Sequence, residues 1–256
     1  MNDTNFIETK NIHLINKDGE ILYQNGKIKV IKCGISRIET GVYSNKKKIV
    51  GENIYRKKNH IVSISLPNSV TQIGFEAFYD CDKLESITIP ESVSEIEANA
   101  FSGCSNLTIL TIPNGVKRIS ECTFSRCSKL SSVSIPTSVT EIGRGAFLGC
   151  SKLLKIGIPQ RVNEIGEWAF SRCSNLISIV IPNGVTEINQ GTFCGCKNLT
   201  SIVIPKSLTR IDELAFYGCK KLKHIYYYGC ERDWQNITIR NDNDAIMRAK
   251  IYYNCK

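Results

Sequence analysis

Proline occurs seven times in this 256-residue chain, and successive prolines lie 23 residues apart. Seven phenylalanines and seven cysteines follow the same interval. The three sets are Pro67, Pro90, Pro113, Pro136, Pro159, Pro182 and Pro205; Phe78, Phe101, Phe124, Phe147, Phe170, Phe193 and Phe216; and Cys81, Cys104, Cys127, Cys150, Cys173, Cys196 and Cys219. A fixed period without slippage predicts a solenoid, in which each coil buries its apolar side chains against neighbouring coils.

Each repeat follows the pattern L-x-x-I-x-I-P-x-S-V-x-x-I-G-x-x-A-F-x-x-C-x-x. In one copy, Val133 and Ile135 alternate with Ser132 and Ser134. This alternation predicts a short strand, paired in parallel with the same strand of each neighbouring coil. Pro136 lacks an N–H group and therefore ends the strand.

The second half of the repeat supplies the other walls of the core. Val139 and Ile142 are expected to point inward from a short extended or single-turn segment. Ala146 is small and leaves room for the ring of Phe147 to stack on the phenylalanine of the next coil. Cys150 closes the turn before the next strand. The predicted fold class is a β-rich solenoid with a parallel strand ladder, short second-wall segments and a cap at each end.

The L-x-x-I-x-I segment resembles the strand signature of leucine-rich repeats. The 23-residue form, with Pro after the strand and a later A-F-x-x-C, resembles the BspA-like subfamily, over residues 61–227. The tail resembles the terminal module of bacterial members at Tyr227, Tyr228, Gly229, Trp234, Ile237, Ile239, Ala245, Ala249, Ile251 and Tyr253. The resemblance implies a curved right-handed superhelix that binds proteins or other surfaces, has no shared catalytic residues and is often an exported adhesin.

The chain divides into four expected parts. Asp-Gly and Asn-Gly between alternating apolar runs predict a β-meander cap over residues 1–33. Residues 34–60 are interpreted as a degenerate repeat with a basic insertion, and residues 61–227 as seven repeats. Residues 228–256 form the expected C-terminal capping module, with short helices, a closing strand at 250–253 and Trp234 over the last core.

The net charge of +9 is concentrated at the two ends. Residues 61–220 carry 14 Lys+Arg and 14 Asp+Glu, whereas residues 1–60 carry 12 and 6. The densest cluster consists of Lys46, Lys47, Lys48, Arg56, Lys57 and Lys58. Such a patch suits an acidic glycan, a nucleic acid or an anionic membrane. The alternative is a solvated loop that keeps the stack soluble.

The cysteine pattern favours reduced thiols. Adjacent coils lie about 4.8 Å apart, whereas a disulfide prefers Cβ atoms about 3.8 Å apart, so bridging neighbours would strain both coils. Reduced core cysteines and the lack of a signal peptide at the start favour the cytoplasm, whereas the family resemblance allows a secreted or cell-surface location. No stretch approaches the roughly 20 apolar residues that span a bilayer.

No catalytic or metal-binding motif is visible. His13, His60 and His224 belong to no nucleophile motif, and no Cys-x-x-Cys pair occurs. Carboxylates recur beside the core isoleucine at Glu95, Glu141, Glu164 and Glu187, where a surface row paired with Arg or Lys is expected. We therefore expect no enzyme activity, no cofactor and no metal.

The outward positions of the strands are the expected binding surface. They are Ser63 and Ser65, Ser86 and Thr88, Ile109 and Thr111, Ser132 and Ser134, Lys155 and Gly157, Ser178 and Val180, Ser201 and Val203, and His224 and Tyr226. This face is rich in hydroxyls and becomes apolar and aromatic toward its C-terminal end. Such a strip suits protein contact. Its candidate binding residues are Ser132, Ser134, Ser178, Val180, Ser201, Val203, His224 and Tyr226.

Three functions remain open from these residues. The leading one is a monomeric, adhesin-like module that binds a protein through the strand face. The second is binding of a polyanion by the basic N-terminal cluster, with nucleic acid the less expected polyanion. The third is recognition of a regular lattice by the Ser/Thr rows, although Ile109, Lys155 and Gly157 interrupt their regularity. Small hydroxyl side chains also simply suit a crowded concave sheet.

Overall fold

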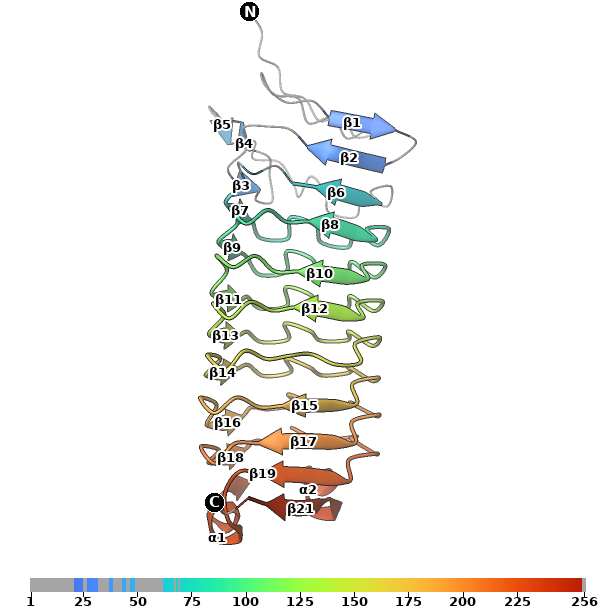
Figure 1. Ribbon diagram of the computed structural model, residues 1–256. Coiled ribbons are helices and arrows are strands. Elements are labelled where there is room, and N and C mark those ends of the chain that lie inside the picture. The colour runs from blue at the N-terminus through green and yellow to red at the C-terminus, as the bar shows by residue number, and fades with distance from the viewer. Residues whose placement is uncertain are drawn as a thin grey trace, which may run out of the picture.

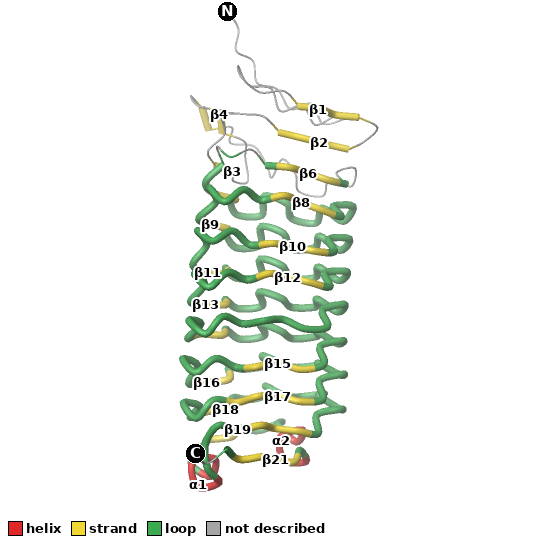
Figure 2. The backbone as a smooth tube through the Cα atoms, viewed as in Figure 1, coloured by secondary structure: helices red, strands yellow, loops and turns green. Residues whose placement is uncertain are grey.

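The structure is a computed structural model that describes residues 62–66, 68 and 70–254, together with the backbone of five strands nearer the N-terminus. The described coils stack one upon another along a single axis (Figure 1). Most of each coil is loop and turn, with one three- or four-residue strand on one wall and a two-residue strand on another (Figure 2). The predicted solenoid with a parallel strand ladder is confirmed.

The first wall, here called the strand face, carries the longer strands. They are β6 (Ser63–Ser65), β8 (Ser86–Thr88), β10 (Ile109–Thr111), β12 (Ser132–Ser134), β15 (Ser178–Val180), β17 (Ser201–Ile204), β19 (His224–Tyr227) and β21 (Lys250–Tyr253). They pair in parallel within three groups, β6-β8, β10-β12 and β15-β17-β19-β21. Within the repeats the register equals the repeat length, as in Ser178↔Ser201 and Val180↔Val203. Because the register is the period, equivalent side chains form straight columns across the coils.

The second wall carries strands of two residues each. They are β3 (Arg37–Ile38), β7 (Gln72–Ile73), β9 (Glu95–Ile96), β11 (Arg118–Ile119), β13 (Glu141–Ile142), β14 (Glu164–Ile165), β16 (Glu187–Ile188), β18 (Arg210–Ile211) and β20 (Thr238–Ile239). In the repeats from β7 to β18 the isoleucine is buried, and the polar residue before it lies toward solvent. The repeat pattern predicts a second wall on the other side of the core from the strand face, and these strands form it.

The third wall is a stack of tight turns around the phenylalanine ladder. The seven rings are fully buried, and successive ring centroids lie 5.1–5.7 Å apart in stacked geometry. Backbone bonds join the turns, for example from the Phe124 N–H to the Ala146 carbonyl at 2.9 Å. Each turn uses two residues with positive φ: Gly145 and Gly149 in one coil, and Trp168 and Arg172 in the next. Glycine adopts this conformation without cost, whereas a bulky residue is strained there.

The cysteine ladder completes the hydrogen bonding of this wall. The Phe78 carbonyl accepts a bond from the Cys81 N–H of its own coil at 3.2 Å and one from the Cys104 thiol of the next coil at 3.1 Å. The thiols of Cys127, Cys150, Cys173, Cys196 and Cys219 repeat this contact along the stack. A buried thiol fills space as a small apolar group and still satisfies a carbonyl lone pair. All ten described cysteines are free.

One coil departs from the plan. Between β12 and β15 the strand-face segment at residues 155–157 forms no strand (Figure 2). It separates the four-stranded sheet β15-β17-β19-β21 from the N-terminal part of the ladder, which consists of the pairs β6-β8 and β10-β12. Gly157 occupies the outward position here, and a Cβ atom added to it would meet nothing within 4 Å. Glycine weakens a strand because it loses more entropy and packs no side chain. The predicted strand at Lys155 and Gly157 is therefore wrong, whereas Ile156 remains buried as predicted.

The C-terminal module closes the last coil. Helix α1 (Glu231–Gln235) begins with a capping box in which the Asp233 carboxylate accepts the Cys230 N–H at 3.0 Å. Trp234 is buried edge-on against Tyr227, with ring centroids 5.2 Å apart, which confirms its predicted covering role. Helix α2 (Asp244–Arg248) follows, and β21 adds the closing strand predicted at 250–253.

At the other end, the backbone shows β1 (Ile21–Gln24) and β2 (Lys27–Ile31) pairing antiparallel, with β2 beside β6 (Figure 1). Strands β4 (Tyr43–Ser44) and β5 (Lys47–Lys48) form a second antiparallel pair. The rest of the expected meander and the basic insertion around residues 50–60 lie outside the described residues.

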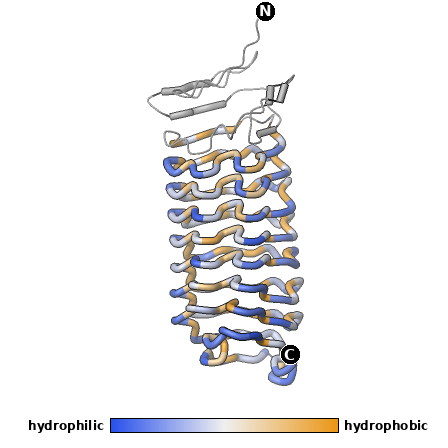
Figure 3. Tube along the Cα trace, turned by 180° about the vertical axis from the view of Figure 1, so that it is seen from behind, coloured by the Kyte–Doolittle hydropathy of each residue, from blue (hydrophilic) through white to orange (hydrophobic). Residues whose placement is uncertain are grey.

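Seen from behind, each coil alternates between hydrophobic and hydrophilic residues, and the alternation recurs from coil to coil (Figure 3). The inward residues form one continuous core from Ile64 to Ile246. Since the core positions are uniform, differences between coils are confined to outward side chains, which is where a binding surface has to be sought.

Candidate binding surface

The four-stranded sheet at the C-terminal end of the strand face displays two columns of outward side chains. The first column runs Ser178, Ser201, His224, Lys250, and the second runs Val180, Val203, Tyr226, Tyr252. The second column is apolar or aromatic in every strand. Val180 and Tyr226 are exposed at 48% and 43% of their surfaces. Exposed apolar and tyrosine side chains on a rigid sheet are typical of the anchors of protein interfaces.

Aromatic rings gather at the last two strands. The rings of Tyr226 and Tyr252 stack with centroids 5.1 Å apart. His224 lies 5.8 Å from Tyr252, with the Tyr252 hydroxyl 3.3 Å from Nδ1 of the imidazole. The Lys250 ammonium lies 5.1 Å from the centre of the Tyr252 ring, a cation–π contact. These contacts hold the rings in place before any partner arrives, which reduces the ordering cost of binding.

The N-terminal part of the strand face differs in chemistry. Its outward residues are mostly serine and threonine, and the Ser86 hydroxyl donates to the Ser63 hydroxyl at 3.0 Å. Ile109 is the exception, with 62% of its surface exposed. Hydroxyls that already bond one another gain little from a partner, because a new bond only replaces an existing one.

The predicted partner-binding residues therefore separate into two groups. The structure brings Ser178, Val180, Ser201, Val203, His224 and Tyr226 together on one sheet. Ser132 and Ser134 lie in β12, which pairs with β10 on the far side of the interruption at residues 155–157. In the basic cluster, only the backbone of Lys47 and Lys48 is described; Lys46, Arg56, Lys57 and Lys58 lie outside the described residues, as do His13 and His60.

Sequence reasoning missed four residues of this surface. Tyr252 and Lys250 were placed in a closing strand, but their register with Tyr226 and His224 appears only when β21 pairs with β19. Leu154 and Ile177 lie one residue before the expected outward pair, and both are exposed, at 49% and 41% of their surfaces. A signal for them exists in the sequence, because five of the other coils place Glu, Thr, Ser or Lys in this column and only the first places an apolar residue, Val62.

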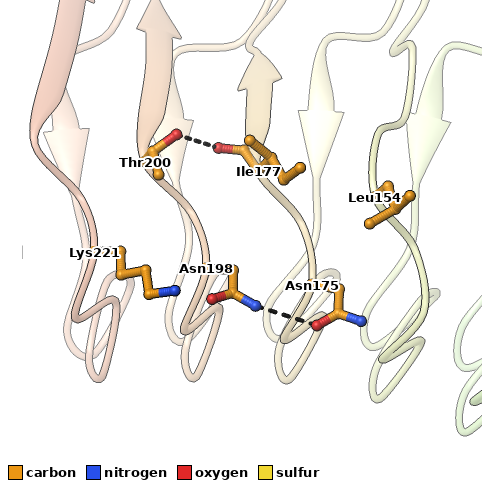
Figure 4. A pocket seen from close by; sticks show the side chains of 6 residues that line it. All are labelled: Leu154, Asn175, Ile177, Asn198, Thr200 and Lys221. Carbon is orange, nitrogen blue, oxygen red and sulfur yellow. Dashed lines mark hydrogen bonds between the residues drawn. The ribbon is translucent and has the colours of Figure 1, made fainter.

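Leu154 and Ile177 line an open groove of about 380 Å³ at the corner where the chain enters the strand face (Figure 4). Asn175, Asn198, Thr200 and Lys221 complete its lining. The Asn198 amide donates to Asn175 Oδ1 at 3.2 Å, and the Thr200 hydroxyl donates to the Ile177 carbonyl at 3.0 Å. One row of the groove consists of Leu154, Ile177 and Thr200, and the other, polar row consists of Asn175, Asn198 and Lys221 (Figure 4).

The second wall carries ion pairs between neighbouring coils. Arg118 pairs with Glu141 at 2.9 Å, and Arg210 pairs with Glu187 at 2.5 Å, which confirms the predicted surface row at these two glutamates. Within the described residues, no three His, Cys, Asp or Glu side chains are grouped so as to hold a metal ion. Over the same part of the chain, no helix has the length and apolar character needed to span a membrane.

Burial raises the pKa of eight of the ten described cysteine thiols, which makes these eight poor nucleophiles. Burial raises the pKa of Cys127 and Cys173 to about 12. Burial also raises the pKa of the half-exposed thiols of Cys122 and Cys194. A thiol reacts as its thiolate, so raised pKa values indicate structural cysteines rather than catalytic ones.

A known protein family has the same repeat. The chain matches the model of the BspA type leucine rich repeat region, in six copies, over residues 48–177 and 123–256. It belongs to this family. The resemblance seen in the repeat pattern is thereby confirmed. No curated protein matches the chain.

Several solved structures are similar to this member of the family. A leucine rich cell surface protein from Faecalibacterium prausnitzii is 22% identical, with 88% of this chain and 97% of that chain covered and a TM-score of 0.42. A leucine-rich repeat protein from Bacteroides ovatus is 25% identical, with 94% and 78% covered and a TM-score of 0.47. The T. pallidum leucine rich repeat protein is 22% identical, with 93% and 96% covered and a TM-score of 0.47.

Proposed function

We propose that this chain is a non-catalytic binding module that holds a protein partner against β15, β17, β19 and β21. The observation that carries the proposal is the outward column Val180, Val203, Tyr226, Tyr252, which is apolar or aromatic in four successive strands. Burying such side chains contributes about 25 cal/mol per Å² of apolar surface. The rigid sheet beneath them keeps the ordering cost of association low.

The extent of the face favours a macromolecular partner over a small ligand. A small-molecule site is usually a concave pocket that encloses most of the ligand. The columns instead extend over four strands, and the adjoining groove is open. The binding of a polyanion by the basic N-terminal residues stays a prediction, since their side chains lie outside the described part.

A site-specific crosslinker tests the proposed contact directly. Val203 is replaced by the photoreactive amino acid p-benzoylphenylalanine, and the protein is irradiated with cells and medium of its source organism. The control carries the same amino acid in place of Thr111, which occupies the equivalent position in the N-terminal part. We expect one predominant crosslinked polypeptide from position 203 and none from position 111.

The crosslinked polypeptide is then purified and titrated calorimetrically. We expect the triple variant Val180→Asp, Val203→Asp, Tyr226→Asp to bind at least 100-fold more weakly, since anchor residues typically cost about 2 kcal/mol or more. The matched control is Thr88→Asp, Thr111→Asp, Ser134→Asp, which places three charges in the same column of the N-terminal part. Equal affinity of the two variants would contradict the proposal.

A further inference from the structure

Charge is distributed unevenly around the last coils of the solenoid. In their strand segments and the turns just before them, residues 151–158, 174–181, 197–204, 220–227 and 250–253, there are seven lysines and no aspartate or glutamate. The lysines are Lys152, Lys155, Lys197, Lys220, Lys221, Lys223 and Lys250, and all are exposed. The equivalent segments of the three preceding coils carry only Lys83 and Lys129, balanced by Asp82 and Glu85.

The carboxylates of the same coils lie elsewhere, and four of them, Glu167, Glu187, Asp212 and Asp233, form ion pairs there. On the second wall, Glu187 pairs with Arg210 at 2.5 Å, and Glu167 pairs with Arg144 at 3.5 Å. In the C-terminal module, Asp233 pairs with Lys206 at 3.2 Å. Within the described residues, none of the seven lysines of the strand face forms an ion pair. Their charge is therefore available to a partner.

The groove places this charge beside exposed aliphatic surface. Leu154 and Ile177 belong to one row of its lining, and Lys221 stands at the end of the other row, after Asn175 and Asn198 (Figure 4). Lys223 follows two residues later, in the same repeat column as Leu154 and Ile177. A ligand that uses the whole groove has to supply an apolar group and a negative charge a few ångströms apart.

We propose that the partner docks as an acidic polypeptide segment that alternates carboxylate and apolar side chains. One apolar side chain lies between Leu154 and Ile177, and carboxylates approach Lys221 and Lys223. This inference rests on the proposed function and names the chemistry of its partner. The uncompensated lysines select an acidic partner and speed its encounter by steering. The aliphatic side chains of the groove favour a polypeptide over an acidic glycan, because a glycan has no aliphatic side chain to bury there.

Synthetic peptides test this chemistry independently of the natural partner. The probe is a fluorescein-labelled peptide of 12 residues that alternates glutamate with leucine, and binding is measured by fluorescence anisotropy at low and high salt. Three peptides of equal length replace every glutamate by lysine, every glutamate by glutamine, or every leucine by serine. A heparin oligosaccharide serves as the acidic glycan. We expect only the acidic, apolar peptide to bind well, with an affinity that falls as salt increases.

Two variants locate the site. Lys221→Glu with Lys223→Glu should weaken the binding of this peptide by about tenfold or more. Leu154→Ser with Ile177→Thr should weaken it by about tenfold through the loss of apolar contact. The second pair installs residue types that the repeat itself uses in this column, at Ser131 and Thr200, so the coil should still fold. The control, Lys83→Glu with Lys129→Glu, changes lysines in the same repeat column as Lys221 and should bind within twofold of the unmodified protein.

Several outcomes would overturn the inference. Equal binding of heparin or of the glutamate–serine peptide would indicate a general polyanion surface that does not use the groove. Equal or tighter binding of the glutamine or lysine peptide would show that the lysines do not select the partner. The lack of binding by any peptide would reject the acidic segment as well. In each case the crosslink from position 203 still tests the proposed function separately. Failure of the acidic-segment inference can therefore be distinguished from failure of the proposed function.

Discussion

The two parts of the strand face share one backbone plan but present different surfaces. In β8 and β10 the outward residues are mostly hydroxyls, whereas in β17 and β19 they include Val203, His224 and Tyr226. The inward residues between them are the same kind throughout, with Ile87 and Leu110 in one part and Ile202 and Ile225 in the other. An inward position is constrained by close packing with two neighbouring coils, whereas an outward one meets only solvent or a partner.

The interruption at residues 155–157 lies where the two surfaces meet. The exposed Leu154 directly precedes it, and the exposed Ile177 and Val180 follow in the next coil. On its N-terminal side, β12 presents Ser132 and Ser134. The comparison therefore concerns two parts of one strand face with a common core. Three further predictions test whether the cores of the two parts are equivalent and whether the interruption at residues 155–157 separates the two parts.

The largest effect is expected from alkaline pH. Burial raises the pKa of Cys104, Cys127, Cys150, Cys173, Cys196 and Cys219. The unfolded chain therefore loses these protons first. The stabilisation is complete below the ordinary thiol pKa of about 8.5, and it is lost as the pH rises toward the folded values, by on the order of 1 kcal/mol per thiol for each pH unit. Urea unfolding under reducing conditions at pH 7.5, 8.5 and 9.5 measures the decline.

Single alanine variants assign that decline to the two parts. Cys127 and Cys173 lie on opposite sides of the interruption, and burial raises the pKa of each thiol to about 12. Each is replaced by alanine, which gives Cys127→Ala and Cys173→Ala. Each should reduce the pH dependence of the free energy of unfolding by the same amount, about one thiol's share. Unequal reductions would show that the cores of the two parts differ. An unchanged slope in both variants would show that groups other than the ladder thiols cause the decline.

The next largest effect is expected from the phenylalanine ladder. Phe124 and Phe193 are both fully buried between two stacked rings. Both follow a threonine, Thr123 or Thr192, whose hydroxyl donates to a backbone carbonyl three residues earlier. Phe124→Ala and Phe193→Ala should each lower the free energy of unfolding by about 3–5 kcal/mol through loss of contact and cavity formation.

Because the two phenylalanine sites match so closely, the two losses should agree within about 1 kcal/mol, given how widely cavity costs vary between sites. Chemical denaturation followed by circular dichroism measures both. A clearly smaller loss at Phe193 would indicate that the coils next to the C-terminal module tolerate a cavity better. The cores of the two parts would then differ in stability although their residues are alike.

The smallest effect is expected from repairing the interruption. Lys155→Ser with Gly157→Ser installs the outward residues of β12 in the coil that lacks a strand. A Cβ atom fits at position 157, since nothing lies within 4 Å of it. The replacement of glycine should stabilise the protein by about 0.5–1 kcal/mol. Hydrogen exchange should show slower exchange of the backbone amides at residues 155–157, and unchanged exchange would mean that Gly157 is not what prevents the strand.

Much of the fold could be predicted from the sequence because each repeat carries its apolar residues at the same positions, which stacking of the coils buries. The period alone placed Phe147 and Cys150 in the core, and alternation placed Val133 inward. The same reasoning failed at Lys155 and Gly157, where two unfavourable strand residues replace the consensus. It also missed Leu154 and Ile177, because a consensus averages over the coils and hides the positions at which one coil departs from the others.

The sequence by itself determined the architecture, since a 23-residue period with apolar residues at fixed places can bury them only by stacking coil on coil. Only the tertiary structure decided what the surface offers. The pairing of β21 with β19 puts Tyr252 beside Tyr226, although 25 residues separate them in the chain. Stacking likewise brings Leu154, Ile177 and Lys221 from separate coils to one groove. Strand register decides which residues that are distant in the chain become neighbours. The sequence repeat predicts this register only where the 23-residue period is unbroken.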